Sequence, residues 1–160
     1  MARRVIVVGA GAAGLMAAGR AAECGADVLL LEKTSEAGKK ILVTGKGRCN
    51  LTNTAPLRQF IRYYGPNGRF LRNAFHRFFR PELIDLLARY SVETKEERGG
   101  RVFPVSDDAT DVRNALLRYA EGQGAEVRYR AEVNRVLTEG GEASGVLLWD
   151  SRTLSADVVI

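Results

Sequence analysis

A glycine motif between two apolar runs constrains this chain more than any other feature. The β-branched run 5–8 is typical of a strand buried on both faces of a parallel sheet. It leads directly into the motif Gly-x-Gly-x-x-Gly at 9–14, and an Ala-rich, helix-favouring stretch follows at 15–23. A second apolar run, 28–31, ends at Glu32, eighteen residues after the last glycine. This order predicts a strand–helix–strand unit that binds a dinucleotide.

Each residue of the motif has a physical role in such binding. Gly9 permits the tight turn from strand to helix, Gly11 lets a pyrophosphate approach the backbone, and Gly14 lets the helix pack closely on the strand. The phosphates would lie on the free N–H groups at the positive end of the helix. Glu32 can accept hydrogen bonds from a ribose 2′-OH and would repel a 2′-phosphate. The alternative is a chance glycine-rich turn in an α/β protein.

The connection after Glu32 is longer than in an ordinary NAD domain. Roughly 90 residues separate it from the next convincing strand, 126–133. The stretch 37–53 has no helical periodicity. The remaining expected elements are helices at 69–79, from Pro81 onward and at 109–121 with Asp108 as cap, a hairpin over 92–105 turning at Gly99-Gly100, and strands at 134–138, 145–149 and 156–160. This order is similar to that of FAD domains of the glutathione-reductase type.

Two short runs are more specific than the glycine motif. Residues 38–53 read GKKILVTGKGRCNLTN, and residues 100–104 read GRVFP, with Ser106 close behind. Together they resemble the BaiN/RdsA family, also called YhiN-like, of NAD(P)/FAD-dependent oxidoreductases, and the resemblance covers essentially the whole chain. It implies an α/β fold: a Rossmann-like FAD/NAD(P)-binding domain of glutathione-reductase type, with a small β-meander and an inserted helical and hairpin cap.

The predicted organisation has three segments. Residues 1–53 would form the first part of the FAD-binding domain, 54–105 the inserted cap, and 106–160 the second part of the FAD-binding domain. The chain stops on the apolar run 157–160 with no turn or cap after it. Since members of the family are longer, we expect this chain to be the N-terminal part of a longer protein, truncated in its cofactor domain.

The resemblance also implies site residues and a reaction. Lys33 and Lys40 would lie near the adenosine and phosphates, Val133 would contact adenine at the end of the third strand, and 47–50 would line the flavin side. The predicted cofactor-binding set is Gly9, Ala10, Gly11, Ala12, Ala13, Gly14, Glu32, Lys33, Lys40, Gly47, Arg48, Cys49, Asn50 and Val133. The implied reaction is hydride transfer through FAD between NAD(P)H and an organic small molecule. Neither a catalytic acid or base nor a metal site is assigned. An NAD-binding dehydrogenase without flavin is the alternative.

Thiols and apolar segments point to a cytoplasmic protein. Cys24 and Cys49 form no CxxC or metal-like cluster, which disfavours structural zinc and a dithiol redox centre. Arg48 could lower the pKa of the neighbouring Cys49 thiol, although a packing role or a cofactor contact is favoured. The single histidine, His76, is interpreted as structural or solvated. The uncharged run 5–19 is too short to span a bilayer.

The net charge of +5 is the sum of two regions with opposite charge. Residues 37–81 hold ten basic and no acidic side chains, and the rest of the chain sums to −5. Seven of the 12 aromatics lie among these basic residues: Phe60, Tyr63, Tyr64, Phe70, Phe75, Phe78 and Phe79. Arginines with stacking aromatics are typical of surfaces that bind single-stranded nucleic acid. However, Phe70, Ala74 and Phe78 would share one helix face, which favours an amphipathic cap with buried aromatics. An anionic small molecule and RNA remain the alternatives, with nucleic acid disfavoured.

Overall fold

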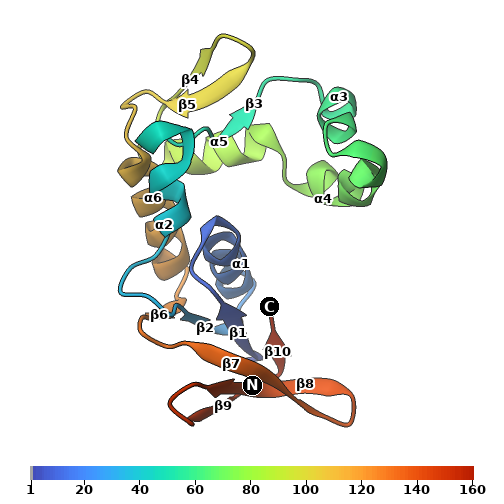
Figure 1. Ribbon diagram of the computed structural model, residues 1–160, viewed down its shortest axis with the longest axis vertical. Helices are drawn as coiled ribbons and strands as arrows, with labels where there is room; N and C mark the ends of the chain where they lie inside the picture. Colours follow the sequence, from blue (N-terminus) through green and yellow to red (C-terminus); the bar gives the residue numbers. More distant parts are fainter. Residues whose placement is uncertain (1) are drawn as a thin grey trace. The chain divides into compact units, whose positions relative to one another are not determined.

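The computed structural model describes residues 2–160, which form two compact units (Figure 1). The first comprises Met1–Ile41 and Leu116–Ile160, and the second comprises Leu42–Ala115. Each unit is described by itself. Residues 42–53 group with the second unit, and residues 106–115 do so as well.

The first unit is built on a four-stranded parallel sheet in the order β10-β1-β2-β6. Its elements are β1 (Arg4–Val8), α1 (Ala12–Glu23), β2 (Asp27–Leu31), β6 (Glu126–Arg128) and β10 (Val158–Val159). Ile6 and Leu29 are register partners. Because side chains alternate along a strand, the apolar runs of β1 and β2 bury one set of side chains on each face of the sheet. Helix α1 ends where predicted, with Gly25 at a φ of +86° directly after it.

A three-stranded antiparallel meander covers one face of this sheet, opposite α1 (Figure 1). It consists of β7 (Val133–Glu139), β8 (Glu142–Leu148) and β9 (Thr153–Ser155). The core between the two sheets contains Ile6, Leu29, Leu31, Ala131, Val146, Leu148 and Ala156. The predicted β-meander and parallel α/β core are therefore confirmed.

The third strand is shorter than predicted. A strand over 126–133 was expected, but β6 ends at Arg128. Arg130 adopts a φ of +54°, and its N–H donates to the carbonyl of Thr34 at 3.0 Å. This left-handed residue turns the chain out of the sheet. Val133 is consequently the first residue of β7 rather than the end of the third strand, and it packs partly buried against the core between the sheets.

The second unit combines short helices with a small antiparallel sheet. The helices are α3 (Leu57–Arg62), the 3-10 helix η2 (Gly65–Leu71), α4 (Arg72–Arg77) and α5 (Arg80–Arg89). The sheet order is β3 (Thr52–Asn53), β5 (Arg101–Pro104) and β4 (Thr94–Glu97). The hairpin β4–β5 turns at Gly99 and Gly100, as predicted.

Helix α6 (Ala109–Gly122) runs from the second unit into the first. The carboxylate of Asp108 accepts a hydrogen bond from the Thr110 N–H at 2.7 Å, which is the predicted N-terminal cap. The helix buries the four residues that its periodicity predicted: Val112, Ala115, Leu116 and Tyr119.

Two expectations about local structure are wrong. Residues 37–53 do contain helix, as α2 (Lys39–Val43) and the 3-10 helix η1 (Thr44–Gly47), which are too short to show a periodicity. The single helix expected at 69–79 is divided between η2 and α4. Because a 3-10 helix has 3.0 residues per turn, the 3.6-residue pattern does not continue through Leu71.

Three residues of the predicted inward face of that helix, Phe70, Ala74 and Phe78, are therefore exposed. Phe70 is 88% exposed and Phe78 is 39% exposed, so the interpretation of a buried Phe70–Ala74–Phe78 stripe is wrong. A different set of rings packs together, with centroids 5.0–5.8 Å apart: Phe60, Tyr64, Phe75 and Phe79. This aromatic cluster holds α3 against α4 and α5.

Candidate functional site: a glycine loop closed by a carboxylate

The glycine loop after β1 has the geometry that its sequence predicts. Gly9 has a φ of +96°, and a Cβ on Gly14 would lie 1.9 Å from the Gly9 carbonyl oxygen. The helix therefore approaches the loop more closely than any side chain would allow. A Cβ on Gly11, in contrast, would meet no atom within 4 Å. Gly14 is thus needed for packing, while Gly11 leaves an open cradle in front of the loop.

Helix α1 begins at this cradle, and no side chain accepts hydrogen bonds from the backbone N–H groups of its first turn. Gly11 is the N-cap, no side chain caps the helix, and its first turn contains no acidic residue. The exposed residues Ala12 and Ala13 carry backbone N–H groups that have no partner within the helix. An anion at this end would meet free donors and the positive end of the helix dipole.

Glu32 connects the end of β2 to the glycine loop. Its Oε2 accepts a hydrogen bond from the Ala10 N–H at 2.9 Å, and its Oε1 accepts one from the Thr34 N–H at 2.8 Å. Partial burial raises the pKa of this carboxyl, but the hydrogen bonds from Thr34 and Ala10 and the charge of Lys33 outweigh it and lower the pKa. A carboxylate offers about four lone-pair positions, so acceptor capacity remains for ribose hydroxyls.

The chain after β2 returns to the same loop. The Gly38 N–H donates to the carbonyl of Ala10 at 2.8 Å. Lys33 and Lys40 are both exposed on this return segment. The first unit therefore brings together the glycine motif, Glu32 and the segment that carries both predicted lysines, whereas Val133 lies in the core between the two sheets.

Residues 47–50 belong to the second unit, in a tightly wound loop. Gly45, Lys46, Gly47 and Cys49 all have φ values between +57° and +85°. Such left-handed conformations turn the chain sharply, and the Leu51 N–H then donates to the Val102 carbonyl at 2.8 Å. Asn50 is exposed in this loop.

Arg48 fastens the loop to the β4–β5 hairpin. Its Nη1 donates to Glu97 Oε1 at 2.7 Å and to Asp107 Oδ1 at 3.2 Å. Its guanidinium carbon lies 4.1 Å from the centroid of the Phe103 ring. Lys95 and Arg48 lower the pKa of the Asp107 carboxyl. Sequence reasoning missed these partners, because nothing local relates Arg48 to residues about 50–60 positions later. A role for Arg48 at the flavin stays a prediction.

Cys49 is buried, and the suggestion of a lowered thiol pKa is wrong. Burial raises the pKa of Cys49, although a hydrogen bond with the Thr44 side chain acts in the opposite direction. Arg48 directs its charge at Glu97 and Asp107 instead. The thiol is therefore protonated near neutral pH, which disfavours a redox role; the choice between a packing role and a cofactor contact stays a prediction.

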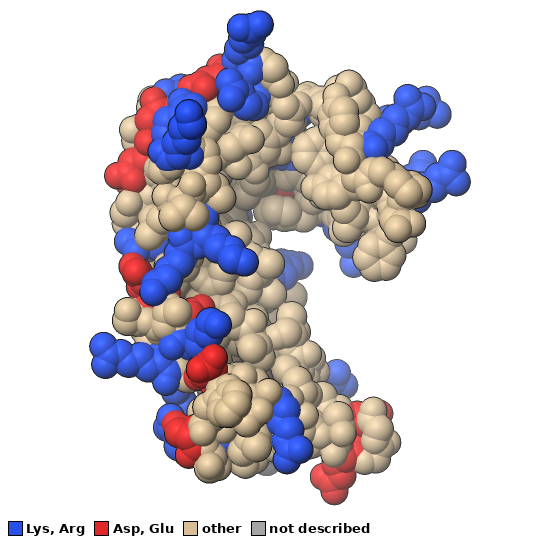
Figure 2. All heavy atoms as spheres, in the orientation of Figure 1, with Lys and Arg blue, Asp and Glu red and all other residues tan. Residues whose placement is uncertain are grey.

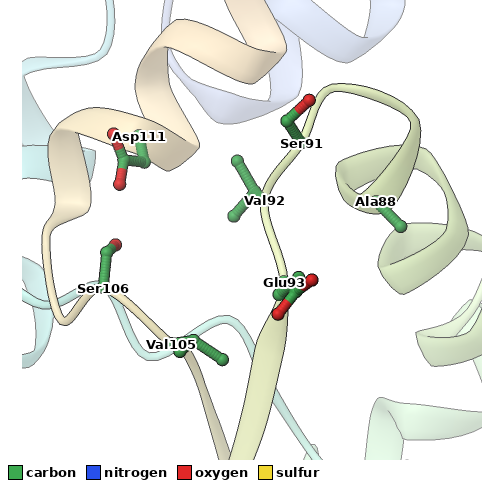
Figure 3. Close-up of a pocket in the computed structure, with 7 residues that line it drawn as sticks. All are labelled: Ala88, Ser91, Val92, Glu93, Val105, Ser106 and Asp111. Atoms are coloured by element: carbon green, nitrogen blue, oxygen red, sulfur yellow. The ribbon is translucent and has the colours of Figure 1, made fainter.

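The second unit also contains two pockets that the sequence did not predict. Figure 3 shows one of about 590 Å³, with Asp111 and Ser106 on one side and Ser91, Val92 and Glu93 on the other. The other, of about 1,030 Å³, is lined by Arg58, Arg62, Arg69, Arg72 and His76 together with apolar residues. The i, i+4 spacing of Arg58 with Arg62 and of Arg72 with His76 was a signal for this second pocket.

Some kinds of site are not found in the part of the chain that the structure describes. Residues 2–160 contain no group of three or more His, Cys, Asp or Glu side chains placed to hold a metal ion. Over the same residues, every helix is too short or too polar to cross a membrane.

Residues 3–160 match the sequence model of the HI0933-like protein Rossmann domain. The chain belongs to this family. The predicted family and the predicted Rossmann-type nucleotide-binding fold are thereby confirmed.

Two curated relatives illustrate the range of the HI0933-like family. The chain is 41% identical over 115 residues to the 3-dehydro-bile acid delta(4,6)-reductase of Clostridium scindens, covering 71% of this chain and 27% of that protein. It is 33% identical over 131 residues to the ribosomal RNA dihydrouridine synthase of Escherichia coli K12, covering 80% of this chain and 31% of that protein. The chain thus spans less than a third of these relatives. The bile-acid relative is a reductase, in agreement with the oxidoreductase class that the resemblance implied.

A solved structure gives the same fold. The 3-ketosteroid-delta4-(5alpha)-dehydrogenase of Rhodococcus jostii RHA1 superimposes with a TM-score of 0.72 at 20% identity, over 98% of this chain and 45% of that one. At this identity the likeness concerns the fold alone.

Proposed function

We propose that this chain is the FAD-binding part of an oxidoreductase that transfers hydride from NAD(P)H to an organic substrate. One observation carries the proposal: the open cradle at Gly11 lies beside an ionised carboxylate, Glu32, that is hydrogen-bonded to the same loop. The open cradle gives a diphosphate room to approach the backbone, and the carboxylate can accept hydrogen bonds from the hydroxyls of an adenosine ribose.

The residues present fit this cofactor. The N–H groups of residues 11–14 would hold the pyrophosphate, Glu32 the ribose hydroxyls, and the exposed Lys33 and Lys40 would offset the phosphate charge. When bound, FAD supplies the hydride-transfer chemistry, and the chain supplies binding, orientation and electrostatics. We propose further that Gly47, Arg48, Cys49 and Asn50 lie on the flavin side, that Val133 contacts the adenine, and that residues 54–105 form a cap on the cofactor domain. Two free thiols support a cytoplasmic location.

Two glycine variants of the full-length protein test the proposal. Gly11→Val adds its side chain to open space at a φ of −79°, so the fold should persist while the cradle is filled. We expect wild-type protein to purify with the visible absorbance of FAD and Gly11→Val to lose it, while the melting temperatures of the two proteins in their FAD-free forms stay similar. The matched control Ala21→Val lies on the same helix away from the cradle and should retain FAD. A wild-type protein that is colourless and cannot be reconstituted with FAD would contradict the assignment of FAD as the cofactor.

A second candidate concerns the substrate. The relative in E. coli is named as a ribosomal RNA dihydrouridine synthase, and the basic segment of this chain presents exposed arginines and aromatics. These observations favour RNA as an alternative to a small organic substrate. Product formation on uridine in rRNA, compared with reduction of a conjugated small-molecule enone by the same purified protein, distinguishes the two.

A further inference from the structure

The larger pocket of the second unit is strongly basic. Side chains of α3, η2 and α4 surround it, and four arginines and one histidine contribute to its lining: Arg58, Arg62, Arg69, Arg72 and His76. The lining contains no acidic residue, and residues 37–81 contain none at all. The pocket therefore carries a charge of at least +4.

These arginines have no anionic partner within the protein. Over the described residues 2–160, none of the four makes an ion pair or a side-chain hydrogen bond. Arg48 and Arg80 in the same unit differ, because Arg48 binds Glu97 and Arg80 donates to the carbonyl of Asn53 at 3.0 Å. Four unpaired guanidinium groups around one hollow repel one another, and an anion in the pocket would relieve this repulsion.

The pocket is fixed by packing rather than formed by mobile side chains alone. Arg58 and Arg62 stand one turn apart on α3, and Arg72 and His76 stand one turn apart on α4. A Cβ on Gly68 would lie 2.1 Å from the carbonyl oxygen of Ile61, so η2 packs directly on α3. The aromatic cluster also joins α3 to α4 and to the start of α5. Figure 2 shows basic side chains protruding from the part of the molecule that α3 and α4 form.

The charge of the pocket is matched better by a ligand with several phosphates than by one with a single phosphate. A single phosphate monoester carries about −2 and would leave the pocket positive. Aromatic side chains stand beside the arginines in sequence: Phe70 is 88% exposed next to Arg69, and Tyr63 is 68% exposed next to Arg62. Surfaces that bind single-stranded nucleic acid combine cationic groups, which contact the phosphate backbone, with exposed aromatic rings, which stack on the bases.

We propose that this pocket binds the phosphate backbone of single-stranded RNA, with Phe70 and Tyr63 stacking on its bases. The proposal rests on the RNA-directed form of the proposed function and names the surface that this form would use. The lining of the other pocket includes the carboxylates of Glu93 and Asp111, which would repel the same ligand.

A charge-matched pair of variants of the full-length protein tests the backbone contacts. R62Q/R69Q/R72Q removes three pocket charges, and R89Q/R98Q/R135Q removes three exposed charges elsewhere. Fluorescence anisotropy with a labelled single-stranded RNA of about 12 nucleotides measures the affinity between low and high salt. The pocket variant should bind the RNA more weakly. The slope of the logarithm of the association constant against log[salt] should become shallower by about 2, because each of the three lost phosphate contacts contributes about 0.7. The control should keep the wild-type slope.

Stacking has its own test. Phe70→Ala and Tyr63→Ala should each weaken RNA binding roughly fivefold or more without changing the salt slope. Trp149→Ala is the matched control, since Trp149 is 65% exposed and lies just after β8 in the first unit. Equal losses in all three variants would contradict stacking at this surface.

Two results would overturn the proposal. One is an equal salt slope for the pocket variant and its control. The other is displacement of the labelled RNA by inorganic pyrophosphate or NADPH added at a concentration equal to that of the RNA. This result would show that the pocket binds a small anion rather than a strand. The visible FAD spectrum, recorded on the same samples, distinguishes the two proposals. A protein that contains FAD but does not bind RNA would contradict the RNA surface alone. A protein that binds RNA but cannot take up FAD would contradict the flavin assignment alone.

Discussion

Glu32 Oε2 accepts a hydrogen bond from the backbone N–H of Ala10 at 2.9 Å. The two residues are 22 positions apart, and the contact joins the ends of two neighbouring parallel strands. The acid that would bind a ribose thus also holds the loop that would bind a pyrophosphate. Cofactor binding and local stability should therefore respond together when Glu32 is changed.

Glu32→Gln should make the protein less stable at neutral pH by about 1 kcal/mol, because hydrogen bonds to a charged acceptor are stronger than those to an amide. The folded-state pKa of Glu32 is lowered, so its stabilisation is present above the unfolded pKa and is lost as pH falls through the folded pKa. Urea unfolding of the apo protein at several pH values measures this. The difference from wild type should be largest near pH 7 and vanish in acid.

Glu132→Gln is the control for this prediction, since the Glu132 side chain is exposed. A stability difference between Glu32→Gln and wild type that is independent of pH would contradict the ionised carboxylate described here.

Two glycines of one motif should differ sharply in their tolerance of alanine. Gly14→Ala would place its Cβ 1.9 Å from the Gly9 carbonyl oxygen, so backbone must move, and we expect a loss of about 3 kcal/mol. Gly11→Ala meets nothing within 4 Å at an ordinary φ and should cost less than about 1 kcal/mol, the effect of alanine at an N-cap. Thermal and urea unfolding of the two apo variants provide the comparison. Equal losses would show that the loop is not packed as described.

The glycine motif could be predicted because its function depends on spacing within one short segment. Gly9, Gly14 and Glu32 act through the local order strand, helix, strand, which the sequence displays directly. The hairpin at Gly99–Gly100 and the cap at Asp108 were predictable for the same reason.

Features that depend on distant partners or on a change of helical repeat could not be predicted. The exposure of Phe70 follows from the 3-10 turns of η2, which shift every later residue around the helix axis. The partners of Arg48 lie on a hairpin and a loop that reach it only in the folded protein. The end of β6 depends on Arg130, whose positive φ no composition signal indicates.

Arg48→Met should loosen the loop that carries the predicted flavin-side residues. The side chain loses its hydrogen bonds to Glu97 and Asp107 and its position over Phe103, so we expect the variant to be less stable than wild type. A double-mutant cycle with Glu97→Gln, measured by urea unfolding, should give a favourable coupling energy between the two side chains. Additive effects of the two changes would contradict the ion pair. The pKa of Asp107 should also rise in the variant, because one of the charges that lowers it is gone.

The two cysteines should differ in reactivity. Cys24 is exposed, whereas Cys49 is buried with a raised pKa. In the native protein an aromatic disulfide reagent at pH 7 should modify Cys24 rapidly and Cys49 only after addition of denaturant. Cys24→Ser is the control that isolates Cys49, and its remaining thiol should react faster only as the pH becomes alkaline. Rapid modification of Cys24→Ser protein at neutral pH would restore a reactive role for Cys49.

The contact between α1 and α6 gives a prediction of compensation. A Cβ on Gly19 would lie 2.4 Å from Cε1 of the Tyr119 ring, and the Tyr119 hydroxyl donates to Glu23 Oε2 at 3.0 Å. Gly19→Ala should therefore force a rigid ring aside and destabilise the apo protein by about 2 kcal/mol. Tyr119→Leu alone should also destabilise it, through the lost hydrogen bond and the space that the ring leaves. In the double variant the added methyl group enters that space, so the combined loss should be smaller than the sum by about 1 kcal/mol or more. Urea unfolding of the four proteins measures this coupling, and strict additivity would mean that Gly19 is not the residue that sets the distance between the two helices.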